Sequence, residues 1–179
     1  MTDGIPLMPT NLNMFDASVP PLVAPAGFQI AAGYIGGDTP HVWTAAEWER
    51  FKNLHRLPIY VRSNSGTSGT ADAFEALHRL YVLGVPHDKR MALDLETRIA
   101  PAYVHEFNDV IQWADYRLWI YGSASTVFSN PPCNGYWVAD YAGKGPFMYP
   151  HANVLATQWT DGPIYDSSLV TDYKPERFW

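Results

Sequence analysis

The order of strand-like and helix-like segments constrains the fold of this chain more than any other feature. As far as residue 121, short apolar runs alternate with segments whose apolar residues repeat at helical spacing. This alternation is typical of parallel strands joined by crossover helices. Beyond residue 121, the gaps between apolar runs are rich in Pro, Gly and Asn and too short for helices. The order therefore predicts an α/β fold, an irregular TIM-like (β/α)5(β)3 barrel whose helices are missing in the second half.

The boundaries of the expected elements follow from turn and capping residues. Thr44 with Glu47 three residues later forms a capping box, which predicts a helix start. A second helix is expected from about residue 70 to 83, with Phe74, Leu77 and Tyr81 on one face, and a third begins with Pro101 in its first turn. The expected strands cover residues 14–18, 29–35, 57–61, 90–95, 118–121, 136–141, 154–159 and 164–170.

Residues 18–28 are too rich in proline for a helix, so the first crossover is expected to be a loop. Residues 1–13 are expected to form an extended N-terminal arm, and residues 14–179 a single barrel domain.

Composition excludes several classes of function. The net charge is −6 and Lys and Arg do not cluster, so nucleic acid is not an expected partner. Cys133 is the only cysteine, which rules out an internal disulfide, and no apolar run approaches membrane-spanning length. Aromatic residues make up 15% of the chain, either as rings that stack on sugars or as ordinary core residues.

One predicted strand ends in two acids, in the sequence Met91-Ala92-Leu93-Asp94-Leu95-Glu96. Side chains alternate along a strand, so Asp94 and Glu96 point the same way, about 7 Å apart along the chain. Two carboxyls held this close cannot both ionise freely, and one pKa should rise. Such a pair can provide a carboxylic acid that donates a proton near neutral pH.

Other predicted strands also end in polar side chains. In α/β barrels the reacting groups lie at the C-terminal ends of the strands, an end called the barrel mouth below. We expect the following residues to converge there with the Asp94–Glu96 pair: Asp16, Asp140, Gln158, Trp159 and Asp166.

Five motifs at these strand ends resemble, in order, those of the family 25 glycoside hydrolases, the muramidase-type lysozymes. The motifs are Phe15-Asp16-Ala17-Ser18, Ala92-Leu93-Asp94-Leu95-Glu96, Trp137-Val138-Ala139-Asp140-Tyr141, Gln158-Trp159-Thr160-Asp161 and Tyr165-Asp166-Ser167-Ser168. Residues 31–96 are more similar still to a glycoside-hydrolase-like domain common in actinobacteria and their phages. This second resemblance includes Gly33-Tyr34-Ile35, Trp43-Thr44-Ala45-Ala46-Glu47-Trp48 and Leu83-Gly84-Val85-Pro86.

The resemblance implies a barrel with five βα units and three bare strands, and a glycosidase that cleaves the glycan of bacterial peptidoglycan. It makes Glu96 the general acid, with Asp94 as its partner, and it implies that Asp16 and Asp166 bind the −1 sugar. The candidate substrate-binding residues are Asp140, Gln158 and four candidate surfaces for stacking on sugars, Tyr60, Trp137, Tyr141 and Trp159. Whether a carboxylate, water or the acetamido group of the substrate attacks is left open.

The alternative is a catalytically inactive barrel that binds glycan or serves as a phage tail structural protein, with virion proteins as partners. The first residues lack a basic region followed by an apolar stretch, so no signal peptide is expected. The protein is therefore expected to be made in the cytoplasm. The resemblance implies action at the cell wall, as a phage-encoded lysin or a virion-associated protein. No cofactor or metal is expected, since none of the six histidines are spaced as in a zinc-binding helix.

Overall fold

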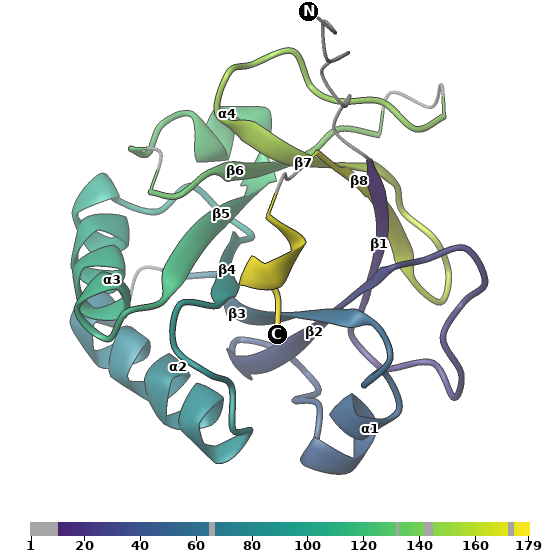
Figure 1. Ribbon diagram of the computed structural model, residues 1–179. Coiled ribbons are helices and arrows are strands. Elements are labelled where there is room, and N and C mark those ends of the chain that lie inside the picture. The colour runs from purple at the N-terminus through teal and green to yellow at the C-terminus, as the bar shows by residue number, and fades with distance from the viewer. Residues whose placement is uncertain (1–10, 65–66, 132, 142–144, 172–173) are drawn as a thin grey trace, which may run out of the picture.

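Eight strands close into a single barrel in chain order, β1 to β8 (Figure 1). This computed structural model describes residues 11–64, 67–131, 133–141, 145–171 and 174–179. Neighbouring strands from β1 to β7 are parallel, whereas β8 is antiparallel to both β7 and β1. The strands are β1 (Leu12–Ala17), β2 (Ile30–Gly37), β3 (His55–Arg62), β4 (Arg90–Leu95), β5 (Arg117–Ser123), β6 (Tyr136–Ala139), β7 (Val154–Thr160) and β8 (Asp166–Val170). The predicted irregular α/β barrel is therefore confirmed.

Two long helices cover one side of the barrel, and the side formed by β6 to β8 lacks them (Figure 1). The helices are α1 (Ala45–Glu49), α2 (Gly69–Val82), α3 (Pro101–Trp113), the short α4 (Ala124–Val127) and a 3₁₀ turn, η1 (Pro175–Arg177). The connection from β1 to β2 holds no helix, as its prolines predict. The capping box at α1 is also confirmed, because the Thr44 side chain accepts from Glu47 N–H while Glu47 accepts from Thr44 N–H.

The buried face of α2 differs from the predicted one. Phe74 and Tyr81 are 53% and 81% exposed, whereas Ala73, Ala76 and Leu80 are buried. Small side chains let the helix approach the sheet closely. This close packing determines which face is buried more than the size of the apolar side chains does. Both faces of this helix carry apolar residues, so the sequence pattern alone did not distinguish them.

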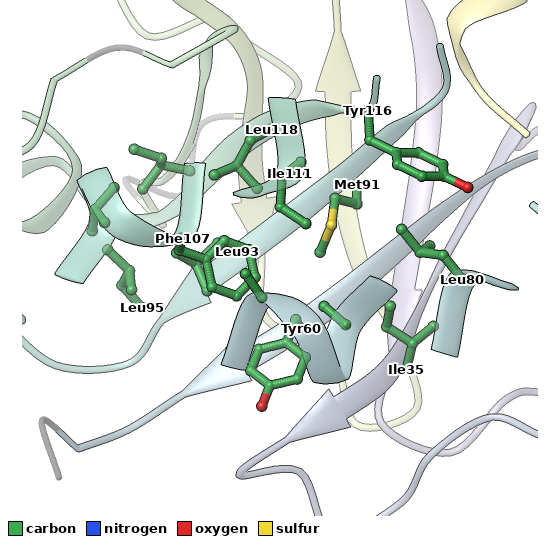
Figure 2. Close-up of a cluster of buried hydrophobic side chains, with 14 of the residues drawn as sticks. Ile35, Tyr60, Leu80, Met91, Leu93, Leu95, Phe107, Ile111, Tyr116 and Leu118 are labelled. Carbon is green, nitrogen blue, oxygen red and sulfur yellow. The ribbon is translucent and has the colours of Figure 1, made fainter. Parts of the chain in front are cut away.

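Alternation along the strands separates two apolar layers. In β4, Leu93 points outward into the layer between the sheet and the helices, which Figure 2 shows with Tyr60 and Phe107. Ala92 belongs instead to the cluster that fills the barrel interior with Trp119 and others. Since Asp94 is two residues beyond Ala92, its side chain also faces the barrel axis, at the mouth.

The opposite end of the barrel is covered by the C-terminal residues (Figure 1). Phe178 is buried there, with its ring centroid 5.6 Å from that of Trp119. The backbones of Arg56 and Trp179 exchange two hydrogen bonds of 2.7 and 3.0 Å. In α/β barrels the reacting groups lie at the other end, the mouth at the C-terminal ends of the parallel strands.

Residues 1–10 of the predicted N-terminal arm lie outside the described residues, and β1 begins at Leu12, two residues earlier than predicted. No helix in the described part of the chain has the length and apolarity needed to span a membrane.

Candidate active site

Four of the predicted acids converge at the barrel mouth. Asp16 lies near the end of β1, Asp94 lies in β4 and Glu96 follows it directly. Asp166 is the first residue of β8, and it reaches the same end because β8 runs in the opposite direction. Asp16 and Asp166 are direct neighbours in the β1–β8 ladder. The mouth therefore combines acids from both ends of the chain and from its middle.

Burial separates the two members of the Asp94–Glu96 pair. Asp94 is 1% exposed, whereas Glu96 is exposed to solvent. Burial, then the charges of Glu96 and Asp16, raise the pKa of Asp94 well above its usual range. The sequence predicted one raised pKa in this pair, and Asp94 has it because its strand position lies inside the barrel.

Asp16 is the second buried acid of the mouth and is 3% exposed. Burial raises its pKa, and the neighbouring charges of Asp166 and Asp161 raise it further. Burial also raises the pKa of Asp166, although a 2.8 Å hydrogen bond from the Gly162 N–H opposes this shift. Oδ1 of Asp16 and Oδ1 of Asp94 are buried and have no hydrogen-bond partner among the described residues. Such groups reduce stability, which makes them candidates for a functional role.

Two tyrosines of the site were not predicted. Tyr34, on β2, has its pKa raised by burial and then by the carboxyls of Asp16, Asp94, Glu96 and Asp166, so its phenol lies within the field of all four. Tyr121, on β5, donates a hydrogen bond from its hydroxyl to Oε1 of Gln158. Strand alternation could have found both tyrosines, because each lies two residues after a residue that faces the barrel interior. These interior residues are Ala32, before Tyr34, and Trp119, before Tyr121.

A cavity of about 230 Å³ opens beside Glu96 and Tyr34. Its walls also include Ser18 at the end of β1 and Asp38 after β2. The cavity therefore brings the exposed acid of the pair and the central phenol to one solvent-accessible space.

Two predicted binding residues form the floor of the mouth. Trp137 is completely buried, its Nε1 donates to Oγ of Ser168 at 3.0 Å, and its ring centroid is 4.4 Å from that of Tyr121. Gln158 is also completely buried, between Tyr121 and the backbone of β7. The prediction of Trp137 as an open stacking surface is wrong, because no face of its ring is accessible.

Three further predicted binding residues lie at the rim. Tyr141 is 50% exposed, and Asp140 and Trp159 are half-buried. The Asp140 N–H donates to the Gln158 carbonyl at 2.9 Å, which joins the ends of β6 and β7. Of the predicted stacking residues, Tyr141 has the most accessible ring.

Tyr60 does not belong to the site. It is buried on the outer face of β3, where its hydroxyl donates to Glu75 of α2 at 2.8 Å and its ring packs near Phe107 of α3 (Figure 2). Its neighbours Ile59 and Val61 face the barrel interior, so alternation turns Tyr60 outward. The prediction of a sugar-stacking role for Tyr60 is therefore wrong.

Arg62 stabilises the loops around the mouth without neutralising its acids. Its guanidinium lies 3.5 Å from Asp38 and 3.4 Å from Asp72, and its Nε donates to the Asn64 carbonyl at 2.8 Å. The Arg62 carbonyl accepts from the Glu96 N–H at 3.0 Å. No ion pair found among the described residues includes Asp94 or Glu96.

The raised pKa of Asp16 predicts a particular dependence of stability on pH. Above about pH 4 the unfolded carboxyl loses its proton, while the folded one keeps it up to the raised pKa. The folded state then binds more protons, so the free energy of unfolding falls as pH rises through this window. Asp16→Asn should flatten this fall, by about 1.4 kcal/mol for each pKa unit removed, and should stabilise the protein at neutral pH.

Urea unfolding at about pH 5 and about pH 7.5 measures this effect. Asp38→Asn is the control, because hydrogen bonds from Ser63 lower the pKa of Asp38 and its removal should reduce stability at neutral pH. Equal pH dependence in the wild type and Asp16→Asn would contradict the prediction.

Comparisons with known proteins identify the class of fold. No protein-family model and no curated protein matches the sequence. Among solved structures, an uncharacterized B. stearothermophilus protein matches with a TM-score of 0.73 at 18% identity, over 94% of this chain and 100% of that one. A family GH25 lysozyme from Aspergillus fumigatus matches with a TM-score of 0.66 at 16% identity, over 93% and 97%.

The Cpl-1 endolysin, solved in complex with a peptidoglycan analogue, matches with a TM-score of 0.61 at 15% identity, over 90% of this chain and 54% of the endolysin. The barrel thus has the fold of the family 25 glycoside hydrolases, as the strand-end motifs indicate. At these identities the likeness establishes the fold, and activity has to be argued from the site. No three His, Cys, Asp or Glu side chains in the described part of the chain are grouped to hold a metal ion.

Proposed function

We propose that this protein is a glycosidase of muramidase type, which cleaves the glycan strand of bacterial peptidoglycan at the cell wall. The observation that carries the proposal is the asymmetric pair at the mouth, in which Asp94 is buried with a raised pKa and Glu96 is exposed beside a cavity. Glycoside hydrolysis requires one carboxyl that donates a proton and a second group that stabilises the positive charge on the sugar. The likeness to lysozymes and endolysins supports this choice of substrate.

In the proposed reaction, Glu96 donates a proton to the leaving glycosidic oxygen. The Asp94 carboxyl is within hydrogen-bonding reach of Glu96, so the two groups can share one proton. In the free protein, burial raises the pKa of the Asp94 carboxyl. A sugar bound in the cavity beside Glu96 would place its glycosidic oxygen where Glu96 can pass on this shared proton.

Asp16, Asp166 and Tyr34 are proposed to hold the −1 sugar. A carboxylate near the anomeric carbon stabilises the oxocarbenium-like transition state, and the Tyr34 hydroxyl can donate to a sugar oxygen. Tyr141 and Trp159 at the rim are proposed to contact the neighbouring sugars, with Asp140 and Gln158 shaping the floor and rim.

Purified protein should release new reducing ends from insoluble peptidoglycan, and mass spectrometry of the fragments identifies the sugar at those ends. N-acetylmuramic acid at the reducing end is expected for a muramidase. If the folded protein releases no reducing ends from walls of several bacterial types, the proposed activity is wrong.

The second candidate is a non-catalytic barrel that binds glycan or builds a phage tail. The structural role within this candidate is favoured by the burial of Tyr60 and Trp137, which leaves fewer rings to hold a glycan than the sequence predicted. Sedimentation with insoluble peptidoglycan, measured beside turnover, separates the two functions. Binding without turnover would support the second.

A further inference from the structure

A second cavity lies at the end of the barrel opposite the mouth. It has a volume of about 480 Å³, roughly twice that of the cavity at Glu96. Lys52, His55 and Arg56, at or just before the start of β3, line it together with Trp179 of the C-terminal segment. Because the proposed glycosidase does not use this end of the barrel, the cavity needs a separate explanation.

The Arg56 guanidinium is held in place by stacking, and the charge of Glu49 reaches it. Its Cζ lies 3.5 Å from the centroid of the Trp179 ring, and the backbones of the two residues are hydrogen-bonded to each other. Nε of Arg56 is buried without a hydrogen-bond partner, and no side-chain hydrogen bond or ion pair to this guanidinium occurs among the described residues. Glu49 pairs instead with Lys52, at 2.6 Å. A guanidinium fixed by stacking, with its N–H groups unused, is suited to bind an oxyanion by two parallel hydrogen bonds.

The charge around the cavity has the sign that such a ligand needs. Lys52 adds a second cation to the wall, and the charge of Lys89 reaches His55, whose pKa is lowered by burial and then by this lysine. Among the described residues, the lining of this cavity holds Lys52, His55 and Arg56 and no acid, whereas Asp38 and Glu96 line the cavity at the mouth. Of these two cavities, this one therefore has the lining that favours an anion.

The rest of the lining indicates how large the ligand is. Phe28 and Leu54 provide apolar wall, and Gln29 and Asn53 provide amides. A bare phosphate ion would occupy only part of about 480 Å³, so the apolar wall favours an anion with an organic group attached.

We propose that this cavity is a binding site for a small organic oxyanion, a carboxylate or a phosphate ester. Arg56 binds the oxyanion through its N–H groups, Lys52 supplies the second charge, and Trp179 keeps the guanidinium in position. The organic group of the ligand packs against Phe28 and Leu54.

Nuclear magnetic resonance of the full chain tests this proposal through the Arg56 Nε–H and the Trp179 indole N–H. The probes are phenyl phosphate, benzoate, inorganic phosphate and, at matched ionic strength, sodium chloride. Both signals should shift saturably with an organic anion, and less affinity is expected for inorganic phosphate. Preference for phenyl phosphate or for benzoate identifies the class of oxyanion.

Two variants test the named cations, with Trp179 as the reporter. Arg56→Gln should weaken binding about tenfold or more, as expected for loss of a charge-assisted hydrogen bond. Lys52→Gln changes an exposed side chain, so it should fold normally and weaken binding several-fold. Arg79→Gln, an equal change of charge on exposed α2 surface, should leave affinity unchanged.

Shifts that do not saturate, that equal those with chloride, or that persist in both Arg56→Gln and Lys52→Gln would overturn the proposal. Glu96→Gln should bind the anion as the wild type does. Loss or absence of glycosidase activity therefore leaves this test unaffected.

Discussion

Glu96→Gln is expected to reduce the release of reducing ends from peptidoglycan by about 10²–10⁴-fold, the range that general acid catalysis contributes. Glutamine keeps the shape of the side chain but has no acidic proton to give to the glycosidic oxygen. Glu96 is exposed, its hydrogen bond to Arg62 uses the backbone N–H, and a glutamine side chain can still hydrogen-bond to Asp94. The free energy of unfolding should therefore change by no more than about 0.5 kcal/mol.

Glu106→Gln is a matched control, since Glu106 is an exposed acid on α3, outside the barrel, where its carboxylate accepts a hydrogen bond from Ser68 that glutamine can also accept. It should retain full activity. If Glu96→Gln keeps more than a tenth of wild-type turnover, Glu96 is not the general acid. Asp94→Asn then becomes the variant to compare, because Asp94 has the raised pKa.

Trp137→Ala is expected to lower the free energy of unfolding by about 3–5 kcal/mol, the range for removing a large buried aromatic side chain. Trp137 is completely buried, contacts Tyr121 and donates to Ser168 across the barrel interior. Alanine would leave a cavity beneath the mouth and an unpaired Ser168 hydroxyl. Urea unfolding at neutral pH measures the loss.

Tyr141→Ala is the comparison for Trp137→Ala, since Tyr141 is an aromatic residue from the same predicted motif but is 50% exposed. It should change stability by less than about 1 kcal/mol and, under the proposed function, weaken glycan binding. If Trp137→Ala does not fold, Trp137→Phe should still unfold at lower urea than the wild type. A stability loss below about 1 kcal/mol for Trp137→Ala would contradict its position in the floor.

The sequence predicted the architecture well because its signals are local. Proline density left the first crossover without a helix, and the capping box at Thr44 placed α1. Strand β4 has the predicted bounds, from Arg90 to Leu95. These elements depend on backbone geometry and hydrophobic periodicity, which neighbouring residues determine.

Predictions about individual aromatic side chains were less successful. Tyr60 and Trp137 are both aromatic residues within short apolar strands. Tyr60 nevertheless packs under α2, whereas Trp137 fills the barrel floor. Tyr34 was not predicted, although its phenol is central to the mouth. Which face of a strand points inward depends on closure of the barrel, and closure involves residues far apart in the chain.

The sequence by itself determined the irregular barrel, the order of its elements and the close spacing of Asp94 and Glu96 at the end of β4. Only the tertiary structure decided that Asp94 is the buried member of the pair, because burial requires the surrounding strands. It also decided that Asp166 meets Asp16, since β8 closes the barrel by pairing antiparallel with β1. The physical reason is that strand periodicity acts over a few residues, whereas desolvation and charge coupling depend on groups that only the closed barrel brings together.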